Sequence, residues 1–434
     1  MDKKLAIFGG EKTIPDGTIK KWPPIDSIDE EYVLSSLRGE IHSFGPNCKE
    51  FEKEFAEWNG NKFAITTNSG TSALHMGIAG CGLGCGDEVI VPAYSWSSSA
   101  TCVLHHNCIP VFVDIEFKTM NIDVNKIEEK ITEKTKAILI VHLHGLSVEM
   151  DKVLKISKKY NLKVIEDSCQ AHGARYKGRK VGTFGNCSAF SFNQNKCLCS
   201  GEGGMFVTDN EEIYEKAKML WSFGETRRPF ENRDYHAYAL GWMYRNNDLT
   251  AAFGRAQLKK LDQYMEIQKK NANVLTEILK EEKGLILPYV PQHCEHNWYN
   301  YTIRIDTEFF GIKGEQRKFR DYILKAIQEE GVKCGIWQSF ILPAMTVFQA
   351  KNAYGKGCPW SCQYYNKKIE YIPEEYPVAQ KHCDTHFGMT EPLRVPNNEK
   401  VAELVGVSIK KVIDDIKEKG VKKWISKVEE VLKK

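Results

Sequence analysis

The chain alternates short apolar segments with segments of helical periodicity between residues 63 and 208. The apolar segments have the length and composition of buried β-strands. They cover Phe63–Thr66, Glu88–Val91, Pro110–Asp114, Ala137–Leu143, Leu162–Glu166, Ser188–Phe192 and Met205–Thr208. Helices are predicted from Thr71 onward, at Ala100–His106 and at Val124–Ile131. Because strands that alternate with helices form parallel sheets covered by helices, we expect an α/β fold with a mostly parallel, doubly wound sheet of seven strands.

The chain as a whole divides into three parts. Residues 1–30 contain several glycines and prolines and are expected to form an N-terminal arm. Residues 31–265 form the predicted large domain, and residues 266–434 form a smaller α+β domain. A long helix that begins near Leu249 is expected to bridge the two domains. The stretch 342–376 has no clear periodicity but carries seven aromatic residues, so we expect it to pack against the protein rather than act as a linker.

The composition is that of an ordinary globular protein. Hydrophobic residues make up 42% and charged residues 27% of the 434 residues, which argues against disorder. Sixty basic and fifty-seven acidic residues leave a formal charge of +3, too balanced to indicate a nucleic-acid or membrane partner. We find no signal peptide and no stretch of eighteen apolar residues, so a cytoplasmic protein is expected. The fourteen cysteines include close pairs but no C-x-x-C motif, which predicts reduced thiols and no metal site.

An acid and a lysine follow two neighbouring predicted strands. Asp167 comes at the end of one strand, and Lys196 follows the next, before the turn sequence SGEGG. Open α/β sheets bind their ligands at the carboxyl ends of the strands. A lysine in such a loop is most often simply solvated. The alternative is a lysine that holds pyridoxal phosphate (PLP) as a Schiff base, with Asp167 keeping the pyridinium nitrogen protonated.

Two further segments match what PLP requires. Ser69, Gly70 and Thr71 lie where a strand gives way to a helix, and free N–H groups at a helix start bind phosphate. A plain N-cap is the other interpretation of these residues. Trp96 follows a strand end and has the flat surface needed to stack on a heterocycle, although it is equally suited to a core position.

Together these segments resemble the DegT/StrS group of PLP-dependent sugar aminotransferases, which have the aspartate aminotransferase fold (fold type I). The resemblance lies in NSGTSALH, GDEVIVPAYSWSSSAT, VIEDSCQAHGARYKGRKVGTFG and SFNQNKCLCSGEGG, in this order. It implies a homodimer with active sites shared between subunits. It also implies that Gly70, Thr71, Ser72 and Ser191 hold the phosphate, Trp96 stacks on the ring, Asp167 pairs with the pyridinium nitrogen, Gln170 lies near the ring hydroxyl and Lys196 forms the Schiff base.

The sequence departs from the family pattern at two places. Many members have histidine three residues before the lysine, whereas this chain has Asn193, which we include among the cofactor-binding residues. The surrounding run is similar to the cyclitol and aminohydroxybenzoate branches. Members commonly have an asparagine where this chain has Met243, so a contact to the neighbouring subunit's phosphate is expected from Arg245 or Asn246 instead.

The predicted function is transfer of an amino group from glutamate or glutamine to a keto group of a sugar or cyclitol. The sugar is free, phosphorylated or nucleotide-linked. The alternatives are an aminodehydratase similar to 3-amino-5-hydroxybenzoate synthase and a non-catalytic regulator that binds a sugar phosphate. A further rival is the dehydratase or deoxygenase branch of the same fold. Its members typically have histidine in place of the lysine, so Lys196 argues against this rival. Phe44, His144 and Trp337 are predicted acceptor contacts from their positions alone.

Overall fold

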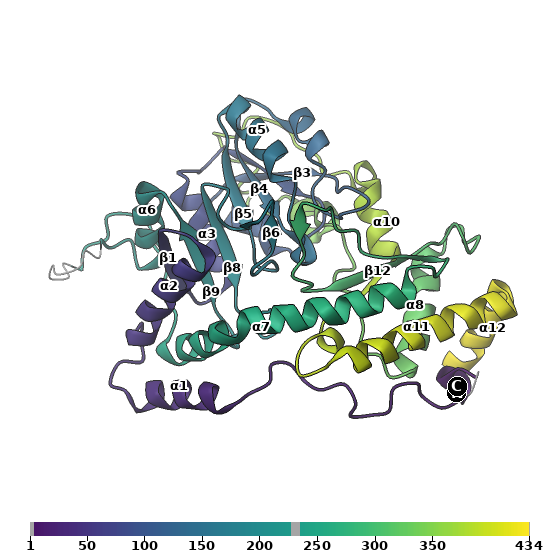
Figure 1. Ribbon diagram of the computed structural model, residues 1–434. Helices are drawn as coiled ribbons and strands as arrows, with labels where there is room; N and C mark the ends of the chain where they lie inside the picture. The colour runs from purple at the N-terminus through teal and green to yellow at the C-terminus, as the bar shows by residue number, and fades with distance from the viewer. Residues whose placement is uncertain (1–3, 227–234, 434) are drawn as a thin grey trace.

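The computed structural model describes residues 4–226 and 235–433, and its centre is a seven-stranded sheet (Figure 1). The strand order is β1-β9-β8-β5-β4-β2-β3. Every neighbouring pair is parallel except the two pairs that involve β9. The strands are β1 (Phe63–Thr67), β2 (Glu88–Pro92), β3 (Ile109–Val113), β4 (Thr135–Val141), β5 (Lys163–Asp167), β8 (Cys187–Ser191) and β9 (Gly204–Thr208). The predicted fold class is therefore confirmed.

Both faces of the sheet are buried, as the residues of β4 show. Ala137, Leu139 and Val141 belong to one hydrophobic core, whereas Ile138 and Ile140 belong to another. Successive side chains of a strand point to opposite faces, so a strand buried on both sides is apolar throughout. The helices that cover the sheet are α2 (Pro46–Asn59), α3 (Gly70–Gly80), α4 (Ser98–His105), α5 (Met150–Tyr160) and α6 (Glu211–Trp221).

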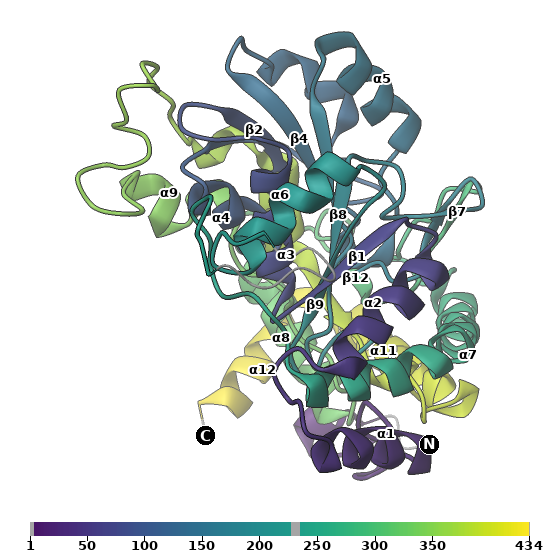
Figure 2. The same ribbon diagram turned by 90° about the vertical axis from the view of Figure 1, so that its left-hand side faces the viewer.

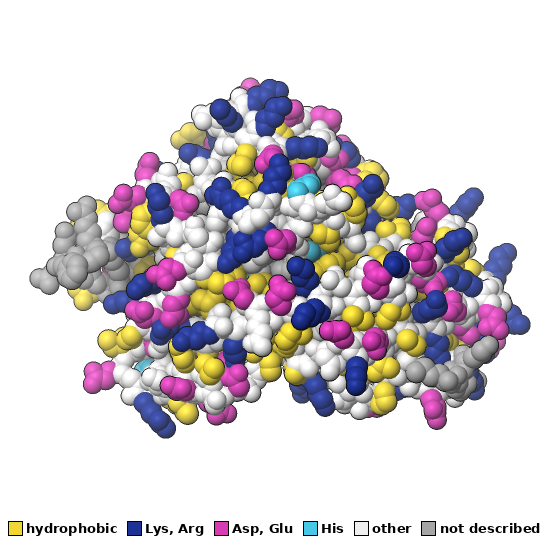
Figure 3. Space-filling model, in the orientation of Figure 1, with side chains coloured by type: hydrophobic (Ala, Val, Ile, Leu, Met, Phe, Trp, Pro, Cys, Tyr) yellow, Lys and Arg dark blue, Asp and Glu magenta, His cyan; other side chains and the backbone are white. Residues whose placement is uncertain are grey.

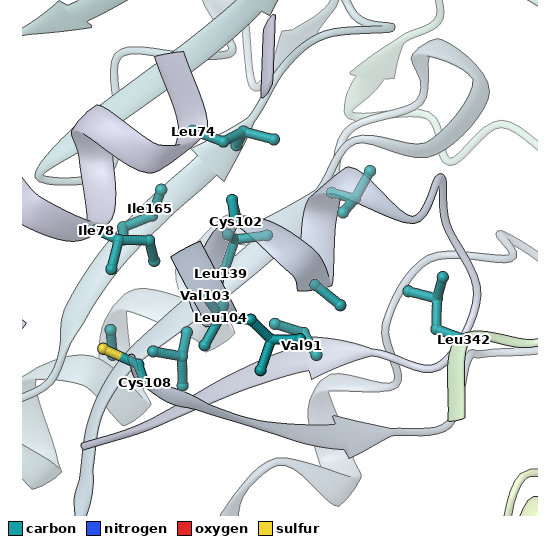
Figure 4. Packing of buried hydrophobic residues seen from close by; sticks show 14 of the residues in the cluster. Leu74, Ile78, Val91, Cys102, Val103, Leu104, Cys108, Leu139, Ile165 and Leu342 are labelled. Atoms are coloured by element: carbon teal, nitrogen blue, oxygen red, sulfur yellow. The ribbon is translucent and has the colours of Figure 1, made fainter. Parts of the chain in front are cut away.

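The larger core lies between the sheet and helices α3 and α4 (Figure 4). Leu74 and Ile78 come from α3, one helical turn apart, and pack beside Ile165 of β5. Leu139 of β4 and Val91 of β2 continue the same layer. Burial of side chains of this size stabilises the fold by about 1.5–3 kcal/mol each. This packing holds the strand ends in fixed positions relative to the start of α3.

A second domain packs beside the first and has its own core. Its sheet is antiparallel, with the order β10-β12-β13. Its strands are β10 (Leu285–Ile286), β12 (Tyr301–Ile305) and β13 (His386–Met389), and its helices are α8 (Gln316–Glu329), α10 (Pro377–Thr385), α11 (Glu399–Lys419) and α12 (Val421–Leu432). The long helix α7 (Asp248–Leu279) joins the domains, and the predicted boundary at residue 265 lies inside it (Figure 1).

The N-terminal residues run along the second domain rather than extending into solvent (Figure 1). Leu5, Ile14 and Ile19 are buried in the core of that domain. The Ile14 N–H donates to the carbonyl of Glu330 at 2.9 Å. Helix α1 (Ser27–Arg38) then packs on α7, and the Ser36 hydroxyl donates to a carboxylate oxygen of Asp248 at 2.6 Å.

The stretch 342–376, which includes the short helix α9 (Thr346–Ala350), projects beside α4 and β2 (Figure 2). The Leu342 N–H donates to the carbonyl of Ala93 at 2.8 Å, and the Tyr371 hydroxyl donates to the carbonyl of Pro110 at 2.8 Å. Leu342 also joins the main core (Figure 4). The expectation that this stretch is packed against the protein is confirmed.

One predicted helix is absent. Residues 124–131 form two 3₁₀ turns, Val124–Lys126 and Glu128–Lys130, in place of an α-helix. The Asp123 side chain accepts the Asn125 N–H at 3.0 Å and caps the first of these turns. A small sheet of β11 (Cys294–Glu295), β6 (Arg175–Tyr176) and β7 (Arg179–Lys180) lies at the surface.

Charges of both signs are mixed over the face shown in Figure 3, without a large area of one sign. This distribution fits the nearly balanced net charge. Across residues 4–226 and 235–433, none of the helices combines the length with the apolar character needed to span a bilayer.

Candidate active site

The predicted site residues gather at the carboxyl ends of the parallel strands. β5 ends at Asp167, β8 ends at Ser191, and α3 begins at Gly70, three residues after the end of β1. The strand order places β8 next to β5, and Asp167 is paired with Ala189 in register. Open α/β sheets bind their ligands at strand ends of this kind.

Asp167 is buried and held in place by hydrogen bonds to both carboxylate oxygens. Its Oδ2 accepts the Ser99 hydroxyl at 2.6 Å, and its Oδ1 accepts the Cys169 N–H at 3.1 Å. Ser99 in turn shares a hydrogen bond with Ser95 at 2.7 Å. These donors hold the carboxylate in one orientation. Neither serine was singled out from the sequence, because a serine in the first turn of a helix, such as Ser99, or just before it, such as Ser95, gives no signal of such a contact.

The Cys169 thiol lies within electrostatic reach of both Asp167 and Lys196. Burial raises the pKa of this thiol well above its usual value, Asp167 raises it further, and the Lys196 ammonium lowers it. Because the charges of Asp167 and Lys196 both affect the Cys169 thiol, the two residues lie in the same region of the molecule.

The Lys196 amine lies against Tyr299. The Nζ is 3.4 Å from the Tyr299 hydroxyl and 4.6 Å from the centre of its ring. The Lys196 carbonyl accepts the indole N–H of Trp22 at 3.1 Å, from the N-terminal arm. Arg394, from the second domain, donates to the carbonyls of Asn195 at 2.8 Å and of Tyr299 at 3.0 Å. The loop that carries the lysine is thus fixed by three residues far from it in the sequence.

The start of α3 forms an anion-binding cradle. Ser69 is the N-cap, and its hydroxyl oxygen accepts the Ser72 N–H at 3.1 Å. The Gly70 and Thr71 N–H groups belong to the first helical turn, where no carbonyl of the helix reaches them. A Cβ atom on Gly70 would lie 2.8 Å from the Cβ of Ser191 and 2.9 Å from the thiol of Cys169. Only glycine therefore lets the helix start approach these strand ends so closely.

Ser72 directs its own hydroxyl to Asn68 Oδ1 at 2.6 Å. The Ser72 side chain therefore holds the segment before the helix, and the Ser72 backbone N–H donates to the hydroxyl of the N-cap, Ser69. Ser191 accepts the Asn193 N–H at 3.4 Å through its hydroxyl oxygen, so its O–H donor points elsewhere. Of the four predicted phosphate residues, Gly70 and Thr71 offer backbone donors, and Ser191 offers a hydroxyl.

Three aromatic rings lie in a row beyond the end of β2. Trp96 follows β2 and is 53% exposed, which leaves a free indole face. Its ring centre is 6.0 Å from that of Trp337, and Trp337 lies 4.9 Å from His144. Burial lowers the pKa of His144 well below its usual value, and the Lys196 charge lowers it further. His144 is therefore neutral at physiological pH.

Gln170 and Asn193 make contacts within the chain. The side-chain carbonyl of Gln170 accepts the His144 N–H at 2.8 Å, which links the ends of β5 and β4. The Asn193 amide donates to a carboxylate oxygen of Glu202 at 2.8 Å, across the turn that follows Lys196. Asn193 thus supports the lysine loop, and its predicted contact with the cofactor stays a prediction.

Phe44, Arg245 and Asn246 lie around the end of β1. Phe44 packs edge-on against Trp221 at 4.7 Å, apart from the rings of Trp96 and Trp337. The Asn246 amide donates to the Thr66 hydroxyl at 3.1 Å, so this donor is used within the chain. The Arg245 guanidinium lies 5.3 Å from the centre of the Phe223 ring. The Arg245 Nε has no hydrogen-bond partner among the described residues.

Comparison with known proteins matches this geometry to one family. The sequence model of the DegT/DnrJ/EryC1/StrS aminotransferase family covers residues 23–388. The chain belongs to this family. It is 38% identical over 313 residues to GDP-perosamine synthase from Caulobacter vibrioides, spanning 72% of this chain and 81% of that protein. A putative L-glutamine:3-amino-2,3-dideoxy-scyllo-inosose aminotransferase from Micromonospora echinospora is 32% identical over 88% of this chain and 90% of its own length.

A solved structure shows the same fold. The crystal structure of 3-amino-5-hydroxybenzoic acid synthase superposes with a TM-score of 0.80 and 25% identity, covering 92% of this chain and 99% of that one. The predicted family and the predicted enzyme class, an aminotransferase, are confirmed by these matches. Enzymes of this family use PLP as their cofactor.

The residues of this DegT-family chain fit PLP. The cradle at Gly70 and Thr71 would offer N–H donors and the partial positive charge of a helix start to the phosphate. The buried Asp167 would offer an anion to the pyridinium nitrogen, and Trp96 would offer an exposed aromatic ring. Lys196 would offer the amine. Each part of the cofactor thus has a matching group among these residues.

Proposed function

We propose that this protein transfers an amino group from glutamate or glutamine to a keto group of a sugar or cyclitol, the sugar being free, phosphorylated or nucleotide-linked. The observation that carries the proposal is the placement of Asp167 and Lys196 around Cys169 beside the helix start at Gly70. The relatives support the substrate class, because their names include a GDP-perosamine synthase and a glutamine:inosose aminotransferase.

The chain's own residues have distinct tasks in this reaction. PLP, when bound, supplies an electron sink for the charge that develops at the donor's Cα. Asp167 keeps the ring nitrogen protonated and so keeps the sink effective. The Lys196 amine would move a proton from the donor's Cα to the C4′ carbon of the cofactor, and in the second half of the reaction it would move a proton from C4′ to the acceptor carbon. Tyr299 holds that amine, and the Gly70 cradle anchors the phosphate so that the reacting atoms stay aligned.

We also propose a homodimer whose active sites use residues of both subunits. Leu37, Ile41, Leu240 and Met243 are apolar side chains with 48–76% of their surface exposed, which is typical of an interface. Arg245 remains the first candidate for a contact with the neighbouring phosphate, since the Asn246 side chain is buried and one of its two amide hydrogens bonds to Thr66. All fourteen cysteines are free thiols, which supports a cytoplasmic location.

Two alternatives have specific support. The structural match to 3-amino-5-hydroxybenzoic acid synthase favours an aminodehydratase as the second candidate. A protein named pleiotropic regulatory protein from Geobacillus stearothermophilus is 32% identical over 77% of this chain and 85% of its own length, which supports a regulator as the third. A regulator would bind its ligand without turnover, whereas the aminodehydratase would lose water from its acceptor.

Half-reaction spectroscopy tests the proposal. The purified protein is mixed with glutamate or glutamine, and loss of the PLP absorbance is followed before a panel of keto sugars and ketocyclitols is added. We expect one donor to discharge the absorbance and one class of acceptor to restore it. Borohydride reduction should attach the cofactor to Lys196, and Lys196→Ala should abolish turnover, while the exposed-lysine control Lys177→Ala keeps it. Undiminished turnover in Lys196→Ala would refute the proposed role.

A further inference from the structure

Three potential metal ligands converge at the surface, away from the active site. One ligand atom each from Glu149, His293 and Cys294 lies within 4.8 Å of the other two. The His293 Nε2 is 2.7 Å from the Glu149 Oε1. In the ranges 4–226 and 235–433 no other group of three such side chains reaches this proximity. The carboxylate and the imidazole are 144 residues apart, so the fold brings them together.

The surrounding structure holds each ligand in place. Glu149 is the N-cap residue of α5, and its second carboxylate oxygen accepts the Tyr176 hydroxyl at 3.3 Å. Cys294 is buried and lies on β11, where it pairs with Tyr176 of β6. The His293 carbonyl accepts the Lys177 N–H at 2.7 Å. A hydrogen bond to the free oxygen of a ligating carboxylate is the kind of support that orients metal ligands.

We propose that Glu149, His293 and Cys294 bind a zinc ion. Thiolate, imidazole and carboxylate are the three ligand types that Zn²⁺ takes in proteins, and sites with three protein ligands keep a water in the fourth position. A sulfur and a nitrogen ligand disfavour Mg²⁺ and Ca²⁺, which prefer oxygen. On binding, the Cys294 thiol releases its proton to solvent and the sulfur bonds to the ion.

An ion at this place has an open route from solvent. A cavity of about 270 Å³ adjoins the cluster and is lined by both Glu149 and His293. Asp123, Glu116, Lys118 and Lys152 also line it. Apart from the ligands, the cavity thus carries two acidic and two basic side chains, and the selectivity for zinc comes from the ligand atoms themselves rather than from the charge of the cavity.

The zinc would tie α5 to the segment that supports the active site. Three residues after Cys294, the Asn297 N–H donates to the carbonyl of Gly145 at 3.1 Å, and the Asn297 amide donates to the carbonyl of Gln170 at 2.9 Å. Zinc at Cys294 fixes the start of this segment. Its role is structural, and the aminotransferase reaction does not depend on it.

Equilibrium dialysis of the purified PLP-bound enzyme against ZnCl₂, followed by elemental analysis, tests the site. We expect one tightly bound zinc per chain in the wild type. Cys294→Ser and His293→Gln should each weaken binding at least about tenfold. Cys85→Ser, which changes an exposed cysteine elsewhere, should bind zinc as the wild type does. X-ray absorption should show one sulfur at about 2.3 Å and a nitrogen at about 2.0–2.1 Å.

His293 is 38% exposed, so His293→Gln tests the site even if the buried Cys294 variant does not fold. Circular dichroism of each variant checks its fold. Zinc should also raise the Tm of the wild type and of Cys85→Ser but not that of His293→Gln, because only a folded site binds the ion. Absence of bound zinc in the wild type, a sulfur-free coordination shell, or equal binding by wild type and His293→Gln would overturn the proposal.

Discussion

Replacing Gly70 with alanine tests whether the start of α3 forms the phosphate cradle. The added Cβ would lie 2.8 Å from the Ser191 Cβ and 2.9 Å from the Cys169 Sγ. Both distances are shorter than any ordinary carbon contact, so the helix start must move away from the strand ends. The free protein can relax in this way. When PLP binds, its phosphate requires the start of α3 to return to its position beside the strand ends. The strain of the added methyl group then lowers the affinity for PLP.

The expected loss of PLP affinity follows from these two contacts. Adding a methyl group to a well-packed site costs about 1–3 kcal/mol. Because 1.4 kcal/mol corresponds to a tenfold change in an equilibrium constant, PLP should bind Gly70→Ala about 5- to 150-fold more weakly. Alanine also favours a helix over glycine by about 1 kcal/mol, but this gain is present with and without PLP and cancels in the affinity.

Fluorescence or absorbance titration of the apo-enzyme with PLP measures the affinity. Gly84→Ala is the matched control, because a Cβ there meets nothing within 4 Å. In a Cys169→Ala background one of the two close contacts is absent. The substitution Gly70→Ala should therefore weaken PLP binding less in that background than in the wild type. If Gly70→Ala binds PLP as tightly as Gly84→Ala does, the close packing at position 70 is not what shapes the cradle.

Three other predictions concern single side chains. Tyr299→Phe removes the hydroxyl that lies 3.4 Å from the Lys196 Nζ. Loss of a hydrogen bond of about 1 kcal/mol should lower kcat about fivefold at full PLP content. An unchanged kcat would show that this contact does not contribute to catalysis. Glu166 is buried and accepts three backbone N–H groups besides His142, so Glu166→Ala should lose about 3–5 kcal/mol in urea unfolding, and a loss under 1 kcal/mol would contradict this. Burial raises the pKa of Glu52 from 4.5 to about 8, so between these values the folded protein keeps a proton that the unfolded chain releases. The free energy of unfolding therefore falls as pH rises through this window, and Glu52→Gln should raise the Tm at pH 8 but not at pH 4.

The strand ends of the site were predictable from the sequence because local signals define them. The run before Asp167 is apolar and then turns polar, and the structure ends β5 at that residue. Ser69 and Gly70 carry the signals of a helix start, which the structure also has. The alternation of strands and helices was sufficient to predict the parallel sheet. Each strand is buried on both faces and therefore apolar throughout, and the short connections limit the possible strand orders.

The partners of these residues were not predictable. Tyr299, Arg394 and Trp22 reach the lysine loop from 103 to 199 positions away, and nothing near them in the sequence marks such contacts. The zinc ligands share this property, because Glu149 lies far from His293 along the chain. The helix predicted at 124–131 was wrong for a different reason: Val124, Ile127 and Ile131 recur every three or four residues, a spacing that two short 3₁₀ turns satisfy as well as an α-helix does.

The contacts of the lysine loop have a consequence for how the enzyme matures. Trp22 comes from the beginning of the chain and Arg394 from near its end, and both bond to carbonyls beside or at Lys196. A ribosome that has completed the large domain has already made Trp22 but not Arg394, so the contacts that hold the lysine loop are still incomplete. Newly made protein should acquire coenzyme only after its last two hundred residues have emerged and docked, and fragments that end before Arg394 should stay colourless however well their sheet is formed.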